Sequence, residues 1–160
     1  MASTYEPIAT TTLGSATNSI TFSSIAGTYT DLLVVVAGTT GTLSGVNVQF
    51  NSDTATNYSR TILYGTGSAA GSGRSTSTNQ IGAGTFSTSQ SICKINIMNY
   101  ANTTTYKTAL CRADAASDEV SSVVGLWRST SAITAIKVAA DPATTFSTGS
   151  TFTLYGIKAA

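Results

Sequence analysis

The sequence predicts an all-β protein: an antiparallel β-sandwich of jelly-roll type, with about ten short strands and little or no helix. Three observations predict this fold. Apolar and polar residues alternate with the period of two that is typical of half-buried strands. Turn signals rich in Gly, Asn and Asp separate these segments at short spacing. No window shows a convincing helical period, and 160 residues suffice for one domain over residues 1–160 with a sizeable core.

Alternation is clearest in SGVNVQFN, where Val46, Val48 and Phe50 share one face. The segment TDLLVVVAG differs, because Leu32–Val36 is apolar on both faces. This pattern indicates a central strand that is packed between layers, or one whose outer face is covered by a neighbouring protomer. The same criteria along the chain predict strands near Pro7–Leu13, Asn18–Phe22, Asp31–Ala37, Gly45–Asn51, Asn57–Gly65, Arg74–Gly82, Ser91–Tyr100, Thr105–Ala113, Val120–Ser129, Ala132–Ala139 and Ser150–Lys158.

The stretch NYSRTILYGTGSAAGSGRSTSTNQIGAGTFST begins like a strand and then becomes rich in Gly, Ser, Thr and Ala. From about residue 65 to 90 it holds almost no apolar side chains apart from Ile81 and Phe86. A linker at this place would leave a thin domain on either side, and disorder is an alternative for part of it. We expect a long surface excursion with one polar strand around Arg74–Ile81, which either faces solvent or contacts a neighbour or a receptor.

The composition is unusually poor in charge. Charged residues make up 9% of the chain, against about 25% in an average soluble domain, while Ser and Thr together supply roughly a third. Such a surface stays hydrated but gives up the colloidal protection that net charge provides. This composition favours a protein that ends up fixed in an assembly.

Two classes of partner are disfavoured by the same composition. The net charge is +1, His is absent, and the Lys and Arg residues are scattered singly, so neither a nucleic-acid partner nor a membrane partner is expected. The longest apolar run, LLVVVA, is far shorter than the ~20 residues of a spanning helix. MASTYEPIATTT has no signal-peptide pattern, so we expect synthesis in a host cytoplasm without export by a cleaved signal.

No constellation of catalytic residues is recognisable, and we predict no catalytic residue, metal site or cofactor. The two cysteines have no His partner, and the adjacent Asp118 and Glu119 would point to opposite faces of a strand. NSDTATN offers oxygen ligands for calcium but lacks the Gly and the distal Glu of an EF-hand loop, so an ordinary Asx turn is favoured. Trp127 and the seven Tyr could form a sugar-stacking platform, although core and edge packing is the simpler interpretation.

Cys93 and Cys111 are expected in neighbouring strands of one hairpin. Buried free thiols are the favoured interpretation, and a cross-strand disulfide is the alternative. A three-residue loop at Ala101–Thr103 would place the two cysteines opposite each other, and a four-residue loop would place them on opposite faces. The sequence does not choose between these registers.

Three segments carry a resemblance to a known group of proteins: TYEPIATTTLGSATNSITFSSIAGTYTDLLVVV, VQFNSDTATNYSRTILYGTGS and the final GSTFTLYGIK. They resemble small virion proteins of tailed bacteriophages, frequent in aquatic phages, whose members open with a YEPIATTTLGS-like strand and close with LYGIK. The resemblance covers most of the chain and is weakest at Ala69–Gln90. It implies a structural role on the particle, as a capsid decoration (cement) protein or as a piece of the tail fibre, and it supplies no catalytic residues.

Composition and resemblance together predict a non-enzymatic protein of the virion, on the capsid surface. The expected partners are the major capsid protein, copies of itself in a homo-oligomer such as a trimer, or both. The alternative is a tail-fibre or receptor-binding module that recognises a cell-surface glycan, and a free carbohydrate-binding module or small hydrolase is a third class. The terminal segments MASTYEPI and GIKAA are expected to be arms, and the residues expected to contact a partner are Tyr5, Glu6, Arg74, Gln80, Phe86 and Lys158.

Overall fold

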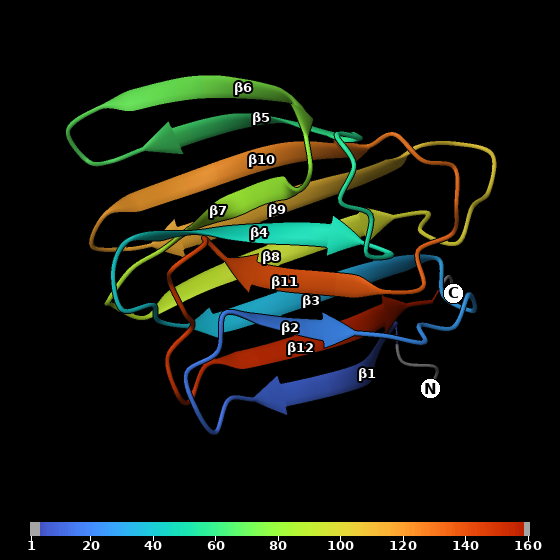
Figure 1. The fold of residues 1–160 in the computed structure, drawn as a ribbon, viewed down its shortest axis with the longest axis horizontal. Helices are drawn as coiled ribbons and strands as arrows, with labels where there is room; N and C mark the ends of the chain where they lie inside the picture. Colours follow the sequence, from blue (N-terminus) through green and yellow to red (C-terminus); the bar gives the residue numbers. More distant parts are fainter. Residues whose placement is uncertain (1–3, 159–160) are drawn as a thin grey trace.

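Twelve antiparallel strands form two sheets in the computed structural model, which describes residues 4–158 (Figure 1). The larger sheet contains, in spatial order, β1 (Tyr5–Thr12), β12 (Thr151–Ile157), β3 (Asp31–Gly38), β8 (Ser91–Met98), β9 (Lys107–Ala115), β10 (Glu119–Trp127), β5 (Tyr58–Gly65) and β6 (Ala70–Thr78). The smaller sheet contains β2 (Ser19–Phe22), β11 (Ile136–Ala140), β4 (Ser44–Phe50) and β7 (Ile81–Phe86).

The strand order is that of a jelly roll with two insertions. The order β1-β12-β3-β8 in one sheet and β2-β11-β4-β7 in the other gives the two four-stranded sheets of an eight-stranded jelly roll. The hairpin β9–β10 follows β8, and the hairpin β5–β6 lies between β4 and β7 in the sequence. Both hairpins extend the first sheet to eight strands. The predicted all-β antiparallel sandwich is therefore confirmed, and the residues described contain no helix.

The core lies between the two sheets and is built around aromatic side chains. Trp127 is 5.6 Å from Phe50 and 6.2 Å from Tyr58, measured between ring centroids. Tyr58 is fully buried, and its hydroxyl donates to the carbonyl oxygens of Phe50 and Asp53. Burial is the main reason why the pKa of Tyr58 rises to about 12. Trp127 is thus a core residue, as the simpler interpretation held, and it offers no platform to a sugar.

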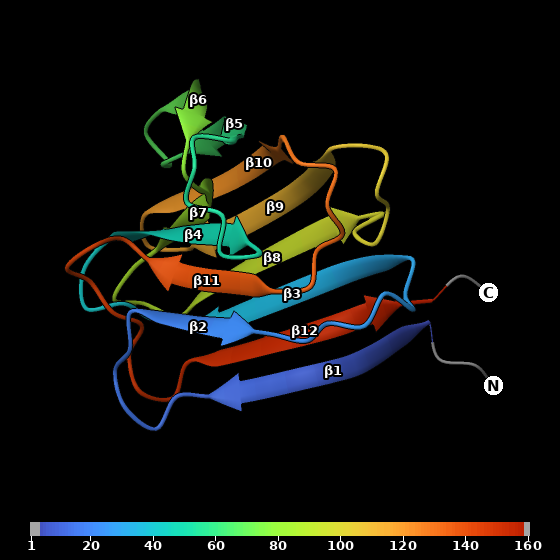
Figure 2. The ribbon, with the colours of Figure 1, turned by 45° about the vertical axis from the view of Figure 1, so that its right-hand side comes forward.

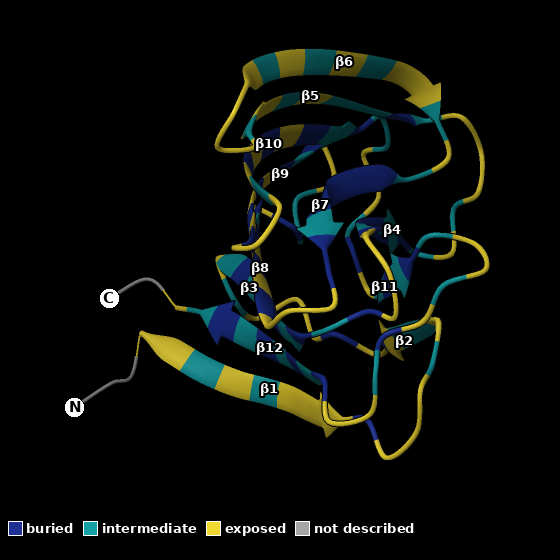
Figure 3. Ribbon diagram, turned by 90° about the vertical axis from the view of Figure 1, so that its left-hand side faces the viewer, coloured by how far each residue is buried: buried dark blue, intermediate teal, exposed yellow. Residues whose placement is uncertain are grey.

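The Gly- and Ser-rich stretch lies on the surface only in its first half. It folds as β6, a polar strand at the edge of the large sheet, followed by β7, which is buried against the core strands β9 and β10 (Figure 3). The expected strand around Arg74–Ile81 instead spans the turn between β6 and β7. Ile81 and Phe86 are fully buried. The expected polar surface strand is therefore present as β6, with bounds earlier than predicted, while the rest of the stretch forms the buried strand β7 and is not part of a surface excursion.

Close packing explains why the sequence of β7 resembles that of a loop. Gly84 has a φ of 146°, a conformation that side chains other than glycine rarely adopt, and a Cβ at this position would overlap the Cβ of Ala113. A glycine thus replaces an apolar residue at a core position, and it breaks the alternation that marks a strand in a sequence. The Gly84 position shows how a strand can be buried without being hydrophobic.

The cysteine hairpin adopts neither of the two registers considered. Cys93 pairs with Ala113, and Ile95 pairs with Cys111, so both thiols lie on the inner face but two positions apart. The two cysteines are buried and free, which confirms the favoured interpretation. Desolvation raises the pKa of Cys93 well above its usual value and that of Cys111 to about 12.

Both ends of the described chain are strands rather than arms. Tyr5 pairs with Ile157 and Glu6 pairs with Gly156, so the two ends lie side by side in the large sheet. The described parts of MASTYEPI and GIKAA therefore do not form free arms, and residues 1–3 and 159–160 lie outside the described part. Along residues 4–158, no helix is long and apolar enough to cross a membrane.

Replacing Gly84 by alanine should lower the free energy of unfolding by about 2–4 kcal/mol, because the new methyl group overlaps Ala113 and the backbone is held at an unfavourable φ. Gly41→Ala is the matched control, since no atom lies within 4 Å of a Cβ placed there. The control should change stability by less than about 0.5 kcal/mol. Chemical denaturation of both variants measures this, and equal stabilities would contradict the packing of β7 described above.

Candidate functional site

The two outer faces of the sandwich differ sharply in their chemistry. Side chains alternate across each strand, so every strand that contributes to the core also presents residues outward. We call the outward side of the eight-stranded sheet the apolar face. Its apolar members are Tyr5, Leu33, Val35, Leu63, Ile92, Met98, Leu110, Val120, Val124, Leu126, Tyr155 and Ile157. No other layer of the described chain lies on this face (Figure 3).

The apolar face is continuous across the sheet. The strand registers place a single row of directly paired residues from one edge of the sheet to the other, and most of its central members are apolar. The row runs Pro7, Tyr155, Leu33, Asn96, Leu110, Val124, Thr61 and Arg74. Large side chains on the face are well exposed, with Leu63 at 62% and Val120 at 57%. Monomers rarely expose contiguous apolar patches beyond a few hundred Å² unless a partner covers them.

Size also sets this face apart from an ordinary surface. Eight strands spaced by about 4.8 Å, each rising about 3.3 Å per residue over some eight residues, span roughly 900 Å². One partner in a standard protein–protein interface buries about 800 Å². The apolar face alone therefore provides an area sufficient for a stable interface.

Two like charges sit near the middle of the apolar face. Lys94 on β8 is directly paired with Arg112 on β9, and like charges directly opposite each other are unfavourable. Within the described residues, only Lys158 and Glu6 form an ion pair. Lys94 and Arg112 thus have no carboxylate within 4 Å. A carboxylate supplied by another molecule would relieve their repulsion.

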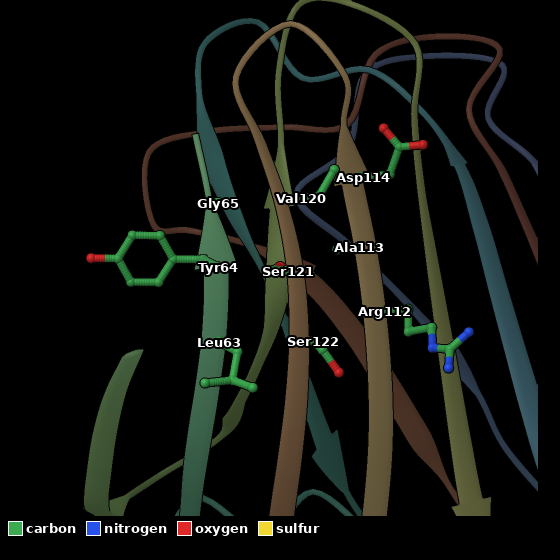
Figure 4. Close-up of a pocket in the computed structure, with 9 residues that line it drawn as sticks. All are labelled: Leu63, Tyr64, Gly65, Arg112, Ala113, Asp114, Val120, Ser121 and Ser122. Atoms are coloured by element: carbon green, nitrogen blue, oxygen red, sulfur yellow. The ribbon is translucent and has the colours of Figure 1, made fainter. Parts of the chain in front are cut away.

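A shallow hollow of about 520 Å³ lies on the same face, over β5, β9 and β10. Figure 4 shows Leu63, Val120 and Ser122 on the neighbouring strands β5 and β10, with Arg112 and Asp114 on β9 beside them. Tyr64 points away from these residues (Figure 4). The hollow is a depression in an otherwise flat sheet surface. Its lining includes one cation, Arg112, and one carboxylate, Asp114.

The outer face of the four-stranded sheet, which we call the polar face, has the opposite character. Its central members are Asn47, Gln49, Lys137, Ala139 and Thr21, from β4, β11 and β2. A groove of about 540 Å³ crosses this face, and a smaller hollow of about 180 Å³, lined in part by Arg60 and Ser75 of the β5–β6 hairpin, adjoins it. Gln80 lines both of them.

The residues predicted to contact a partner are dispersed by the fold. Tyr5 lies at the β1 end of the apolar face and Arg74 on β6, and both are exposed. Gln80 belongs to the groove on the polar face. Glu6 and Lys158 form an ion pair with each other, with 2.8 Å between Lys158 Nζ and Glu6 Oε1.

Phe86 requires a correction. It is completely buried and packs edge-on against Phe146, with 5.9 Å between the ring centroids. It belongs to the core because β7 is an inner strand rather than part of a surface excursion. Phe86 is therefore not available to a partner in the folded chain.

The apolar face and the groove on the polar face were not predicted from the sequence, because no single residue identifies either of them. The outward residues of β8, β9 and β10 alternate with core residues, so each strand by itself resembles an ordinary half-buried strand. A signal was present in Ile92, Leu110 and Val124, which are apolar at positions where the alternation predicts polar residues. Strand order was needed to place these three side chains next to one another.

The segment NSDTATN is an Asx turn, as favoured. Asp53 Oδ1 accepts a hydrogen bond from the backbone N–H of Ala55 at 2.9 Å. Asp53 Oδ2 accepts from Asn57 Nδ2 at 2.9 Å and from Trp127 Nε1 at 2.7 Å. These donors, Asn57 first and Trp127 second, lower the pKa of Asp53 below its ordinary value of 3.8. The carboxylate thus fastens this loop to the aromatic core.

Comparison with protein-family models and with curated proteins gave no match. The description of the site therefore depends on the geometry of this chain alone.

Replacing Asp53 by alanine should lower the free energy of unfolding by about 1–3 kcal/mol at neutral pH, because Trp127 Nε1 is buried and loses its acceptor. The folded-state pKa of Asp53 lies below its unfolded value, so its contribution is complete above that value and is lost as the pH falls through the folded pKa. The stability difference between wild type and variant should therefore shrink below about pH 4.

Denaturation of both proteins across a pH series measures this difference. Asp114→Ala serves as the control, because Asp114 is an exposed carboxylate on β9. A difference for Asp53→Ala that stays constant into strong acid would contradict the assigned role of the ionised carboxylate.

Proposed function

We propose that this chain is a structural protein of a bacteriophage particle: a capsid decoration protein that docks on the shell through its apolar face. The observation that carries the proposal is the uncovered outer face of the eight-stranded sheet. The low charge of the chain and its resemblance to virion proteins support the same role. The chain is proposed to act without catalysis.

The occupant of the apolar face is proposed to be the folded major capsid protein. A two-fold dimer whose axis passes through the Lys94–Arg112 pair would bring four cations together in a desolvated interface, and the two copies of Asp114, two residues from Arg112 on β9, would offset only part of this charge. A shell surface that carries carboxylates would complement the same pair. Charge complementarity at the centre of the face thus favours a different protein over a second copy of this chain.

The expected contacts follow from the composition of the face. Leu63, Val120 and Val124 are large, exposed and neighbours in the sheet, so they would form the apolar centre of the interface. Thr and Ser side chains surround them and can form hydrogen bonds at the rim. Many copies on one shell would add avidity, so each single contact can be modest.

Val124→Lys should lower the occupancy of this protein on particles strongly, because the substitution places an unpaired charge in the middle of the docked face. A penalty of about 3 kcal/mol corresponds to roughly a hundredfold weaker binding. Thr21→Lys is the matched control, since it introduces the same residue at an exposed strand position on the polar face.

Both variants are added to particles that lack the protein, and the bound amount is quantified after sedimentation. The expected result is loss of binding for Val124→Lys alone. Equal binding of both variants would overturn the docking surface. If the isolated wild-type chain forms an oligomer that only Val124→Lys disrupts, the face joins copies of this chain and the proposed occupant is wrong.

A tail-fibre or receptor-binding module that recognises a cell-surface glycan is the second candidate function. The groove across the polar face favours it, because amide and hydroxyl groups line a surface on the far side of the sandwich from the apolar face. Copy number separates the two candidates. A ratio to the major capsid protein near unity, or near a simple fraction, would support decoration. A ratio of a small percentage would support the tail location and contradict decoration.

A further inference from the structure

We propose that the groove on the polar face, together with the hollow beside it, binds an acidic saccharide, and that Lys137 recognises its carboxylate. The groove is lined by Asn18, Gln49, Thr54, Gln80, Lys137 and the loop residues that follow β11. It adjoins the hollow that contains Asn47, Arg60 and Ser75. This inference rests on the second candidate function, glycan recognition, and names its site and ligand class. It does not depend on whether the protein is located on the capsid or on the tail.

The shape of the site comes from the way the large sheet meets the small one. The hairpin β5–β6 is the end of the large sheet, and it lies beside β7 (Figure 2). Arg60 reaches from β5 to β7, where Arg60 Nη1 donates to the carbonyl oxygen of Gly82 at 3.0 Å. A Cβ at Gly82 would overlap the Arg60 guanidinium. The absence of a side chain at Gly82 thus allows a cation to form the inner wall of the hollow.

The amide side chains along the groove are held in place and still have free groups. Gln49 Nε2 donates to the carbonyl oxygen of Asn79 at 2.9 Å, and Asn47 Nδ2 donates to Asp141 Oδ1 at 2.8 Å. Each amide is fixed through its nitrogen, so its carbonyl oxygen remains able to accept. Carbonyl acceptors in fixed positions are suited to sugar hydroxyl groups, which both donate and accept hydrogen bonds.

The charge of the site is positive. Lys137 lines the groove and Arg60 lines the hollow, whereas none of the lining residues of either is a carboxylate. The nearby Asp141 is occupied, since its Oδ2 accepts from the backbone N–H of Gly45 at 2.7 Å and its Oδ1 accepts from Asn47. Among the described residues 4–158, no carboxylate lies within 4 Å of Lys137 Nζ. A cation without a partner, set among neutral acceptors, favours a ligand with hydroxyl groups and a carboxylate.

Other anionic ligands fit the site less well. Nucleic acid requires several clustered cations to neutralise successive phosphates, and this groove has one lysine with one arginine in the adjoining hollow. An extended acidic peptide would need apolar pockets for its side chains, and the apolar lining is limited to Pro142 and small alanines. The chemistry of the lining therefore favours a saccharide with carboxylate groups.

Titration of the isotope-labelled soluble protein with short oligogalacturonates, followed by NMR, tests this proposal. The same oligosaccharides as methyl esters are the neutral control. Chemical-shift changes are expected at Gln49, Gln80 and Lys137 with the acidic form, and weaker binding with the ester. A hydrogen bond to a charged group contributes enough binding energy for about a tenfold change in affinity, so Lys137→Gln should weaken binding about tenfold.

Lys94→Gln is the matched control variant, because it removes the same charge from the apolar face. It should leave the affinity unchanged, and Gln80→Ala should lower the affinity several-fold. Within residues 4–158 the Lys137 side chain forms no hydrogen bond, and the substitution leaves the backbone pairing of β11 in place, so thermal melting should show both lysine variants folded. A panel of acidic oligosaccharides with different linkages extends the titration.

Four results would overturn the proposal. One is the absence of shift changes in the groove at millimolar concentrations of every member of the panel. The second is equal binding of acid and ester, and the third is equal weakening by Lys137→Gln and Lys94→Gln. The fourth is a preference for single-stranded DNA of matched charge over the saccharides. None of these results bears on the copy number or on the docking of the apolar face, so failure here is distinguishable from failure of the proposed function.

Discussion

A β-sheet has two faces, and residues 4–158 cover only one face of the large sheet. The alternation of side chains that builds the core from Leu32, Val34 and Ile95 also sends Leu33, Val35 and their neighbours outward. Because the small sheet has four strands and covers the inner side alone, the outward side stays exposed. The low content of charged residues makes the exposed side more apolar, because few ionic groups are available to hydrate it. The proposed docking surface consists of this uncovered layer.

The two hairpin insertions give the uncovered layer its size. A jelly roll with four strands in each sheet would expose about half of this area, which is less than one side of a standard interface. Addition of β9–β10 and β5–β6 widens the large sheet. These strands add Leu110, Val124 and Leu63 to the apolar face. The same β5–β6 hairpin also forms a wall of the hollow on the polar face. One extension of the fold thus contributes to both surfaces.

Much of the fold was predictable from the sequence, because alternation directly reports which side chains share a face. The two-sided apolar pattern of Leu32–Val36 correctly indicated a central strand, β3, but no second layer of the described chain covers its outer side. β7 was not predictable, since Gly84 occupies a core position where an apolar side chain would normally mark the strand. The placement of Phe86 at the surface followed from that error.

The sites were harder to predict than the strands because they depend on strand order. Val124 and Leu63 are far apart in the sequence, and only the pairing of β10 with β5 makes them neighbours. The cysteine hairpin illustrates a related limit. Its register depends on the turn after Met98, where Asn102 Oδ1 accepts hydrogen bonds from the N–H groups of Thr104 and Thr105. Side-chain geometry of this kind decides a register that the alternation leaves open.

The proposed docking is tested most directly by asking whether the apolar face is covered on the proposed phage particle. Hydroxyl-radical footprinting of particles and of the isolated chain reports the exposure of individual side chains. We expect Met98, Leu110 and Leu63, which are 44%, 38% and 62% exposed in the chain alone, to lose most of their reactivity on the particle. Leu43, which is 59% exposed in a loop away from the apolar face, should keep its reactivity. Unchanged reactivity of Met98, Leu110 and Leu63 on the particle would contradict the central claim.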